Sequence, residues 1–389
     1  MIDVRSLSER GTELVVATGG RVRDAYGSAI GRPAEEVVTP ALLLDLQAAT
    51  RNIKRMAEAL EPMASSIRPH IKVHKSPQLA RMQVDAGATG ISVATVWEAI
   101  VMAGAGLDDI FVVNTVAGPS QIRLLTELAR ERRVFAAVDD IGNARAISVA
   151  SGKAGSNVGL LIEVDTGMDR AGVDTEAEAM ALARDVSTLP GITMDGVTGY
   201  EGHCSLTPDV SERASKQRRA MELLVSVADA IESEVGPMTI RSAGGTATWE
   251  WTAKFPGITE IQAGSYVVMD AFHGDLAPEF ERALTIAATV VSRPSGRVII
   301  DAGSKSVAAP DLVAIEDLEL TNVRFDEEHG VFADGPDAPN IGDVVKIIPG
   351  YAPSTVNMFD AYHVVQEGEV VDIWPVVPRG PGHHGLVTN

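Results

Sequence analysis

The chain has 389 residues, 45% of them hydrophobic, and its formal net charge at pH 7 is −20. This length and hydrophobic content are enough for a large core divided between two domains. An acidic surface repels nucleic acid and anionic membranes, so we expect neither as a partner. Aromatic residues make up only 4% of the chain, which argues against a base-stacking platform as well.

The cysteine count and the lack of long apolar runs indicate the cellular compartment in which we expect the protein. Cys204 is the only cysteine, which excludes an intrachain disulfide framework and fits a reducing cytoplasm. No long apolar run follows the N-terminus, so we expect no signal peptide. No stretch approaches the roughly 18 uncharged apolar residues of a membrane span, and we therefore expect a cytoplasmic protein.

The chain begins with a polar segment, up to about residue 37, that predicts an N-terminal arm with a short helix. Residues 39–46 predict a strand, and residues 47–60 predict a helix because apolar side chains recur at Ile53, Met56 and Leu60. Short apolar strands then alternate with helical patterns. The predicted strands are the first half of 67–75, then 90–95, 109–114, 134–139, 158–165, 194–200, 238–242 and 260–264. The predicted helices between them are 98–103, 121–132, 143–151, 176–186 and 211–232.

Apolar strands separated by helices indicate a parallel sheet that is covered on both faces. Eight such units over about 200 residues favour a closed (β/α)8 TIM-type barrel, and an open doubly wound sheet is the alternative. Beyond about residue 279, strands follow one another without long helices, which indicates a C-terminal antiparallel β domain. These later strands are predicted at 287–292, 297–301, 344–348, 362–365 and 370–374.

We therefore divide the chain into three predicted segments. Residues 1–46 form an N-terminal arm and a strand that joins the β domain, residues 47–282 form the barrel, and residues 283–389 form the β domain. Residues 381–384, Pro-Gly-His-His, are expected to have no fixed structure.

The stretch 67–75, Ile-Arg-Pro-His-Ile-Lys-Val-His-Lys, places two imidazoles and two amines within six residues. Lys72 lies inside the apolar alternation and can point into the barrel, whereas Lys75 lies beyond the strand. A lysine that points inward beside other cations has a lowered pKa, which Schiff-base chemistry requires. The alternative interpretation is a solvated basic loop.

Other polar groups follow the predicted strands at the end where a barrel of this kind carries its active site. Residues 165–172, Asp-Thr-Gly-Met-Asp-Arg-Ala-Gly, follow the fifth strand, and residues 200–203, Tyr-Glu-Gly-His, follow the sixth. Glycines and hydroxyl residues follow the seventh and eighth strands at 242–248 and 264–266. Their backbone N–H groups can bind a phosphate, although an ordinary turn is the alternative. His203 is a candidate general base, and a structural histidine is the alternative.

The motifs Arg-Pro-His-x-Lys-x-His-Lys, Asp-Thr-Gly-Met-x-Arg-x-Gly and Tyr-Glu-Gly-His resemble those of the D-threonine aldolase and D-serine dehydratase family. These are pyridoxal-phosphate enzymes with the alanine racemase type of fold, and the resemblance covers about residues 39–379. It implies that Lys72 carries pyridoxal 5'-phosphate through a Schiff base and that Arg170 lies beside the cofactor's phenolate oxygen. The cofactor-binding residues expected from the resemblance and the strand ends are Lys72, Arg170, Tyr200, Ser242, Gly244, Gly245, Thr246, Gly264, Ser265 and Tyr266.

The sequence departs from this family in its C-terminal part. Metal-dependent members of the family hold a divalent metal with a histidine and, two residues later, a cysteine or aspartate. Here those positions are Tyr351 and Pro353. Proline has no side-chain donor and neutral tyrosine is a poor ligand, so we expect no metal there. Tyr351 is instead a candidate acid/base if neighbouring cations such as His203 or Arg170 lower its pKa, and a space-filling role is the alternative.

The sequence thus predicts a lyase that acts on a β-hydroxy-D-amino acid, by retro-aldol cleavage or by dehydration, with Lys72, His203 and Tyr351 as catalytic residues. One alternative is an amino acid racemase or epimerase in which Lys72 and Tyr351 are the two bases. Another is a non-catalytic pyridoxal-phosphate carrier, but such carriers are small barrels without a β domain. The resemblance also implies a homodimer, since active sites of the family lie at a dimer interface.

Overall fold

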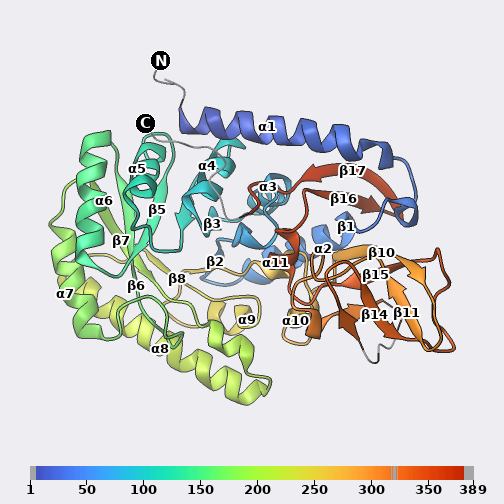
Figure 1. Ribbon diagram of the computed structural model, residues 1–389. Helices are drawn as coiled ribbons and strands as arrows, with labels where there is room; N and C mark the ends of the chain where they lie inside the picture. Colours follow the sequence, from blue (N-terminus) through green and yellow to red (C-terminus); the bar gives the residue numbers. More distant parts are fainter. Residues whose placement is uncertain (1–5, 317, 319–320, 322, 381–389) are drawn as a thin grey trace.

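The computed structural model describes residues 6–316, 318, 321 and 323–380, so the predicted tail at 381–384 lies outside the described residues. A barrel surrounded by helices and a β-rich domain lie side by side, at the left and right of Figure 1. No helix in the described part of the chain is long and apolar enough to cross a membrane.

The barrel contains a sheet of eight parallel strands among the described residues, as the alternation of strands and helices predicts. The strands are β2 (Ser66–Ile67), β3 (Ile91–Val93), β4 (Ile110–Val112), β5 (Val134–Val138), β6 (Val158–Glu163), β7 (Ile192–Thr198), β8 (Ile240–Ala243) and β9 (Glu260–Ile261). They pair in the order β2-β9-β8-β7-β6-β5-β4-β3. A parallel bridge between His70 and Ser92 joins the two ends of this order, so the sheet closes.

Helices surround this sheet, and capping side chains fix where many of them begin. Asp140, for example, accepts a hydrogen bond from the backbone N–H of Asn143 at 2.9 Å and so starts a helix at Ile141. The helices of this part are α2 (Leu46–Leu60), α3 (Pro77–Asp85), α4 (Val96–Gly104), α5 (Pro119–Leu128), α6 (Ile141–Ala154), α7 (Glu176–Ser187), α8 (Val210–Glu234), α9 (Trp249–Ala253) and α10 (Ala271–Gly274).

The first barrel strand is shorter than predicted, because β2 ends at Ile67. Pro69 has no N–H to continue a strand ladder. The chain then turns into the short 3-10 helix η3 (Ile71–Val73), where the His70 ring nitrogen Nδ1 accepts the backbone N–H of Lys72 at 3.4 Å. Lys72 therefore lies on a turn at the mouth of the barrel and not within a strand.

The predicted C-terminal β domain is present, and the strand pairs of its sheet among the described residues are antiparallel except for one. Strand β1 (Ala41–Asp45) lies in this sheet, where it pairs antiparallel with β10 and parallel with β16. The sequence pattern missed three short strands, β12, β13 and β14. The other strands are β10 (Leu284–Ser292), β11 (Arg297–Ile300), β12 (Ala314–Ile315), β13 (Arg324–Phe325), β14 (Gly330–Ala333), β15 (Val344–Ile348), β16 (Ala361–Gln366) and β17 (Glu369–Pro375). A short helix, α11 (Ala352–Val356), follows β15.

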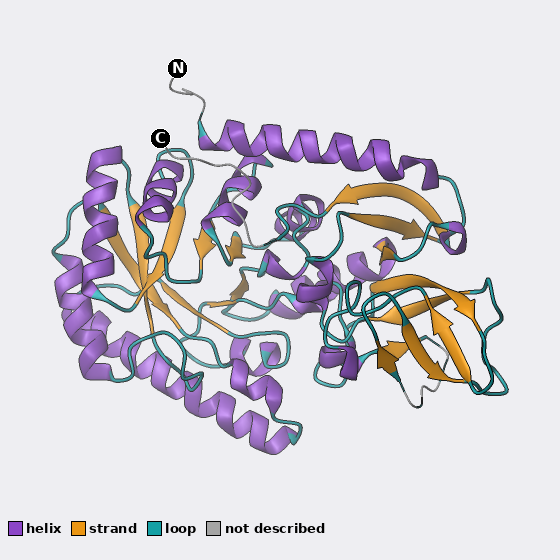
Figure 2. Cartoon of the chain, viewed as in Figure 1, coloured by secondary structure: helices purple, strands orange, loops and turns teal. Residues whose placement is uncertain are grey.

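Helix α1 (Leu7–Tyr26) has 20 residues and is longer than the predicted short helix. It lies across both parts of the molecule, above α4 and β17 (Figures 1 and 2). Its backbone comes so close to α4 that a Cβ on Gly11 would lie 2.2 Å from the Ile100 carbonyl oxygen, so glycine is required there. Thr12 donates a hydrogen bond to the Gly104 carbonyl at 2.7 Å, and Arg23 pairs with Asp372 of β17.

One of the hydrophobic clusters contains side chains from both parts of the chain. It joins Val73 of the lysine turn and Tyr266 of the barrel to Ile347 and Val356 of the β domain. All four are nearly inaccessible to solvent. The lysine turn is therefore held between the barrel and the β domain, and this position sets the location of the candidate site.

Candidate active site

A cavity opens at the C-terminal ends of the barrel strands, where it meets the β domain. Nine of the twelve predicted site residues line it: Lys72, Arg170, Tyr200, Gly244, Gly245, Thr246, Gly264, Ser265 and Tyr351. Ser242, Tyr266 and His203 do not. The cavity is also lined by residues that we did not predict, namely His70, Val73, Val113, Asn114, Glu163, Thr198, Gln262, His273 and Pro353.

Lys72 is the amine that is available in this cavity. Its side chain forms no ion pair with another described residue, and Nζ lies 5.8 Å from the ring centroid of Tyr200. Burial lowers the pKa of Lys72 below its ordinary value, and the positive charge of Arg170 lowers it further. A larger share of Lys72 is therefore the neutral, nucleophilic amine than for a lysine in water.

The other basic groups of the lysine turn are neutralised. Lys75 forms an ion pair with the buried carboxylate of Glu98, with 2.5 Å between Nζ and Oε1. Burial lowers the pKa of both His70 and His74, that of His74 to about 4, so both rings are neutral near pH 7. Of the four basic side chains in this turn, two are therefore neutral and one is paired with a carboxylate, and Lys72 is the amine without an ion pair.

The loop that carries Arg170 is organised by Asp165. The Asp165 carboxylate accepts the backbone N–H groups of Gly167, Met168 and Arg170 at 2.7–3.0 Å. Burial alone would raise the pKa of Asp165, but these hydrogen bonds outweigh it and lower the pKa. Arg170 thereby faces the cavity, and its Cζ lies 5.8 Å from the same Tyr200 ring that Lys72 approaches.

Glu163 also lines the cavity at the end of β6, and burial raises its pKa to about 7. Its atom Oε2 is buried and has no hydrogen-bond partner among the described residues. An unsatisfied buried oxygen beside Arg170 is suited to a ligand that carries a polar group. Sequence analysis missed Glu163, although it stands only two residues before the Asp165 motif.

The two glycine loops contact each other next to the lysine turn. Gly244 has a φ of +86°, and a Cβ on Gly264 would lie 2.5 Å from the His70 carbonyl oxygen. Thr246 links the loops, because its hydroxyl accepts the backbone N–H of Tyr266 at 3.1 Å. The N–H of Gly244 is already bound to the Glu201 carboxylate, so it is not available to a phosphate as we had expected. The N–H groups of Thr246 and Ser265 donate to no other described residue and are available for that role.

Three predicted site residues do not line the cavity. Ser242 is fully buried and accepts a hydrogen bond from Gln262 at 2.9 Å. The Tyr266 phenol is buried in the core, where it accepts a hydrogen bond from Gln83 at 2.8 Å. His203 packs against Gly167, whose φ is +118°, and burial lowers the pKa of His203.

Tyr351 enters the cavity from the β domain of the same chain, at the start of α11. Its ring stacks on that of His273, with 6.3 Å between centroids and 23° between planes. Burial raises the pKa of Tyr351, and the negative charge of Asp270 raises it further. The condition that we set for an acid/base role of Tyr351, a pKa lowered by His203 or Arg170, is therefore not met in this structure.

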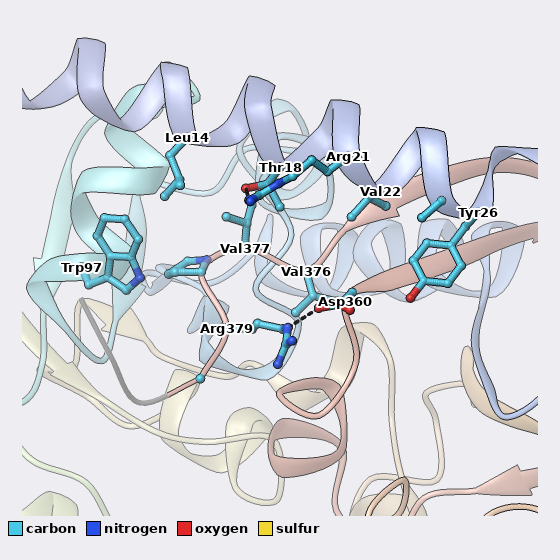
Figure 3. A pocket seen from close by; sticks show the side chains of 13 residues that line it. Leu14, Thr18, Arg21, Val22, Tyr26, Trp97, Asp360, Val376, Val377 and Arg379 are labelled. Carbon is cyan, nitrogen blue, oxygen red and sulfur yellow. Dashed lines mark hydrogen bonds and ion pairs between the residues drawn. The ribbon is translucent and has the colours of Figure 1, made fainter. Parts of the chain in front are cut away.

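A second cavity lies between α1 and the segment that follows β17 (Figure 3). Its walls combine aliphatic and aromatic side chains with charged ones, and Arg379 forms an ion pair with Asp360 at 2.5 Å. No barrel strand ends in it, and none of the predicted site residues lines it. We therefore place the candidate active site in the cavity around Lys72.

Comparison with known proteins agrees with this geometry. Residues 44–271 match the family described as alanine racemase, N-terminal domain, and residues 283–365 match the putative serine dehydratase domain. A D-threonine aldolase of Arthrobacter sp. is 37% identical over 90% of this chain and 95% of its own length. The chain belongs to the D-threonine aldolase and D-serine dehydratase family. Its members are lyases that depend on pyridoxal phosphate.

Two further relatives of this family match over about nine-tenths of the chain. A 3-hydroxy-D-aspartate aldolase of Paracoccus denitrificans is 30% identical over 91% of this chain and 95% of its own length. The crystal structure of a D-threonine aldolase from Filomicrobium marinum is 31% identical, with a TM-score of 0.87. That comparison covers 90% of this chain and 98% of the other. The predicted family and the TIM-type barrel are thereby confirmed.

The cavity residues fit the cofactor of this family. The cavity offers a lysine whose pKa is lowered, a nearby arginine and an unsatisfied carboxyl oxygen, and two glycine loops line it. The family's metal fits less well, because Tyr351 and Pro353 stand at its position. Among the described residues, no group of three or more His, Cys, Asp or Glu side chains is arranged to hold a metal ion. That no metal binds there stays a prediction.

Proposed function

We propose that this protein cleaves a β-hydroxy-D-amino acid to glycine and an aldehyde. The observation that carries the proposal is that Lys72, Arg170 and both glycine loops, which are far apart in the sequence, line one cavity. Relatives that are 30% and 37% identical over nearly their whole length are aldolases of such amino acids. Cleavage is therefore favoured over dehydration as the reaction.

Each group of residues has a role in holding the cofactor. Lys72 would bind the aldehyde carbon of pyridoxal phosphate, Arg170 would face its ring oxygen, and Tyr200 would lie against the ring. The free N–H groups at Thr246 and Ser265 would bind the phosphate. When bound, the cofactor supplies an electron sink for bonds that break at the α carbon of an amino acid.

The residues of the chain then govern protons and solvent. The lowered pKa of Lys72 increases the share of neutral amine, which can accept a proton from the substrate's α carbon. Arg170 keeps a fixed positive charge in the cavity, which stabilises an anionic ring oxygen. Tyr351 closes the side of the cavity that faces the β domain. Its raised pKa keeps the phenol protonated, so it can donate a hydrogen bond but cannot serve as a base near pH 7.

The raised pKa of Tyr351 also weighs against the racemase alternative, which needs a second base opposite Lys72. The carrier alternative has no support either, since the relatives that match over nearly the whole chain are enzymes. One assay separates these functions. The purified protein is incubated with D-threonine, 3-hydroxy-D-aspartate and D-serine, and the products are identified. We expect glycine and an aldehyde. A keto acid as the main product would indicate a dehydratase, and the opposite enantiomer would indicate a racemase.

A further inference from the structure

His273 is a cavity residue for which neither the sequence motifs nor the cofactor provides a role. It lies on α10, directly after the barrel's last loop, and its ring stacks on Tyr351. It lines the same cavity as Lys72, on the side of Tyr351 and Pro353. His273 therefore stands beside the position from which the family's metal would act.

Asp270 holds the His273 ring in a fixed orientation. The Asp270 side chain is fully buried, and its Oδ1 lies 2.7 Å from Nδ1 of His273 and also accepts the backbone N–H of His273 at 2.9 Å. The other oxygen, Oδ2, accepts the N–H of Ala352 at 2.7 Å. Asp270 thus fixes α10 and the segment that follows Tyr351 relative to each other.

The hydrogen bonds determine which nitrogen of His273 carries the hydrogen. An ionised carboxylate only accepts hydrogen bonds, so Nδ1 of His273 donates to Asp270. The neutral ring then has its lone pair on Nε2. Within the described residues, Nε2 has no hydrogen-bond partner, and the ring lines the cavity. A carboxylate that orients an imidazole with a free lone pair is the arrangement of a general base.

We propose that His273, oriented by Asp270, accepts the proton of the substrate's β-hydroxyl group. This inference rests on the proposed aldolase function. The O–H bond breaks and its proton passes to Nε2. The Cα–Cβ bond breaks, its electron pair stays on the α carbon, and the hydroxyl oxygen forms the carbonyl of the aldehyde. The α carbon then takes up a proton to give glycine, and His273 returns its proton to solvent.

The test separates the β-hydroxyl step from the other chemistry of the site. His273→Gln removes the base, and His329→Gln is the matched control because His329 is exposed on the turn between β13 and β14. Two reactions of the holoenzyme are measured: cleavage of D-threonine, and exchange of the α proton of glycine in D₂O. Glycine has no β-hydroxyl group, so exchange does not need His273.

We expect His273→Gln to lower kcat for cleavage by about 10²-fold or more and to leave glycine exchange and the cofactor's absorbance unchanged. The control should match the parent in both reactions. Unchanged cleavage in His273→Gln would overturn the proposal, and so would an equal loss of cleavage and exchange. A parent enzyme that exchanges glycine protons but cleaves no β-hydroxy-D-amino acid would instead overturn the proposed function.

Asp270 is a positioning residue, and its role has a separate test. In Asp270→Asn the amide can donate to Nδ1, which moves the hydrogen of His273 to Nε2 and blocks proton uptake. We expect cleavage to fall while exchange persists, with the melting temperature as a check on folding. Ring ¹⁵N shifts of the parent give a second measurement, in which the histidine signal that His273→Gln removes should show a protonated Nδ1 and a bare Nε2. The opposite tautomer in the parent would contradict the proposal.

Discussion

The two sides of the Lys72 cavity differ in how closely they follow the family pattern. On the barrel side, the lysine turn and the Arg170 loop carry motifs that resemble those of the family, and they line the cavity together with the glycine loops. On the side of the β domain, Tyr351 and Pro353 stand where the metal ligands are expected, and His273 stands next to them. This difference is the basis of our proposal that the cofactor chemistry is retained while another group acts on the substrate's hydroxyl.

Among the substitutions considered, replacement of Lys72 should cause the largest loss of activity. Lys72→Ala should lower cleavage by at least about 10³-fold, because both the covalent bond to the cofactor and a proton-transfer group are lost. Borohydride reduction of the parent followed by peptide mapping should locate the cofactor on Lys72. Labelling of Lys75 would contradict the assignment, since Lys75 is engaged by Glu98.

Replacement of Arg170 tests how its positive charge affects cofactor binding and the pKa of Lys72. Arg170→Gln should weaken cofactor binding by about 10- to 100-fold, the value of one or two hydrogen bonds to a charged group. It should also raise the pKa of Lys72, because Arg170 helps to lower it. The rate at which apoprotein takes up the cofactor rises as Lys72 loses its proton, so the midpoint of this pH profile should move to higher pH. Arg170→Lys, which keeps the charge, is the control, and it should leave the midpoint in place.

Tyr351 belongs to the side that has changed, and we expect a smaller effect there. Tyr351→Phe should lower kcat for cleavage by less than about tenfold, the loss of one hydrogen bond from a neutral donor. The raised pKa of the phenol is the reason, since it excludes a role as base near neutral pH. A loss of about 10²-fold or more, at unchanged cofactor binding, would restore Tyr351 as an acid/base and revive the racemase interpretation.

The fold was largely predictable because strands and helices of the barrel leave a periodic apolar pattern. The failures have local causes. Alternation around Lys72 suggested a strand, but Pro69 ends it early and a 3-10 turn follows. Strands β12 and β13 have two residues each, too few to show alternation. The parallel pairing of β1 with β16 joins residues more than 300 positions apart, as the register of Leu43 with His363 shows, and no local pattern reveals it.

The site was predictable where its residues form contiguous motifs after strands, as with Lys72 and Arg170. His273 was missed because α10 has only four residues and because its partner Tyr351 lies far along the chain. The direction of the Tyr351 pKa could not be predicted for the same reason. The charge that raises it is the buried carboxylate of Asp270, which lies 81 positions away in the sequence. The position of His273 and the pKa of Tyr351 both depend on contacts between the barrel and the β domain.

The central claim is that the Lys72 cavity cleaves a β-hydroxy-D-amino acid without a metal at Tyr351 and Pro353. The most direct test is the rate of glycine release from D-threonine by the holoenzyme before and after treatment with EDTA, with metal analysis of the same samples. We predict an unchanged rate and no stoichiometric divalent metal, because neither side chain is a useful ligand at this position. A rate that falls on chelation and returns when Mn²⁺ or Zn²⁺ is added would contradict the claim.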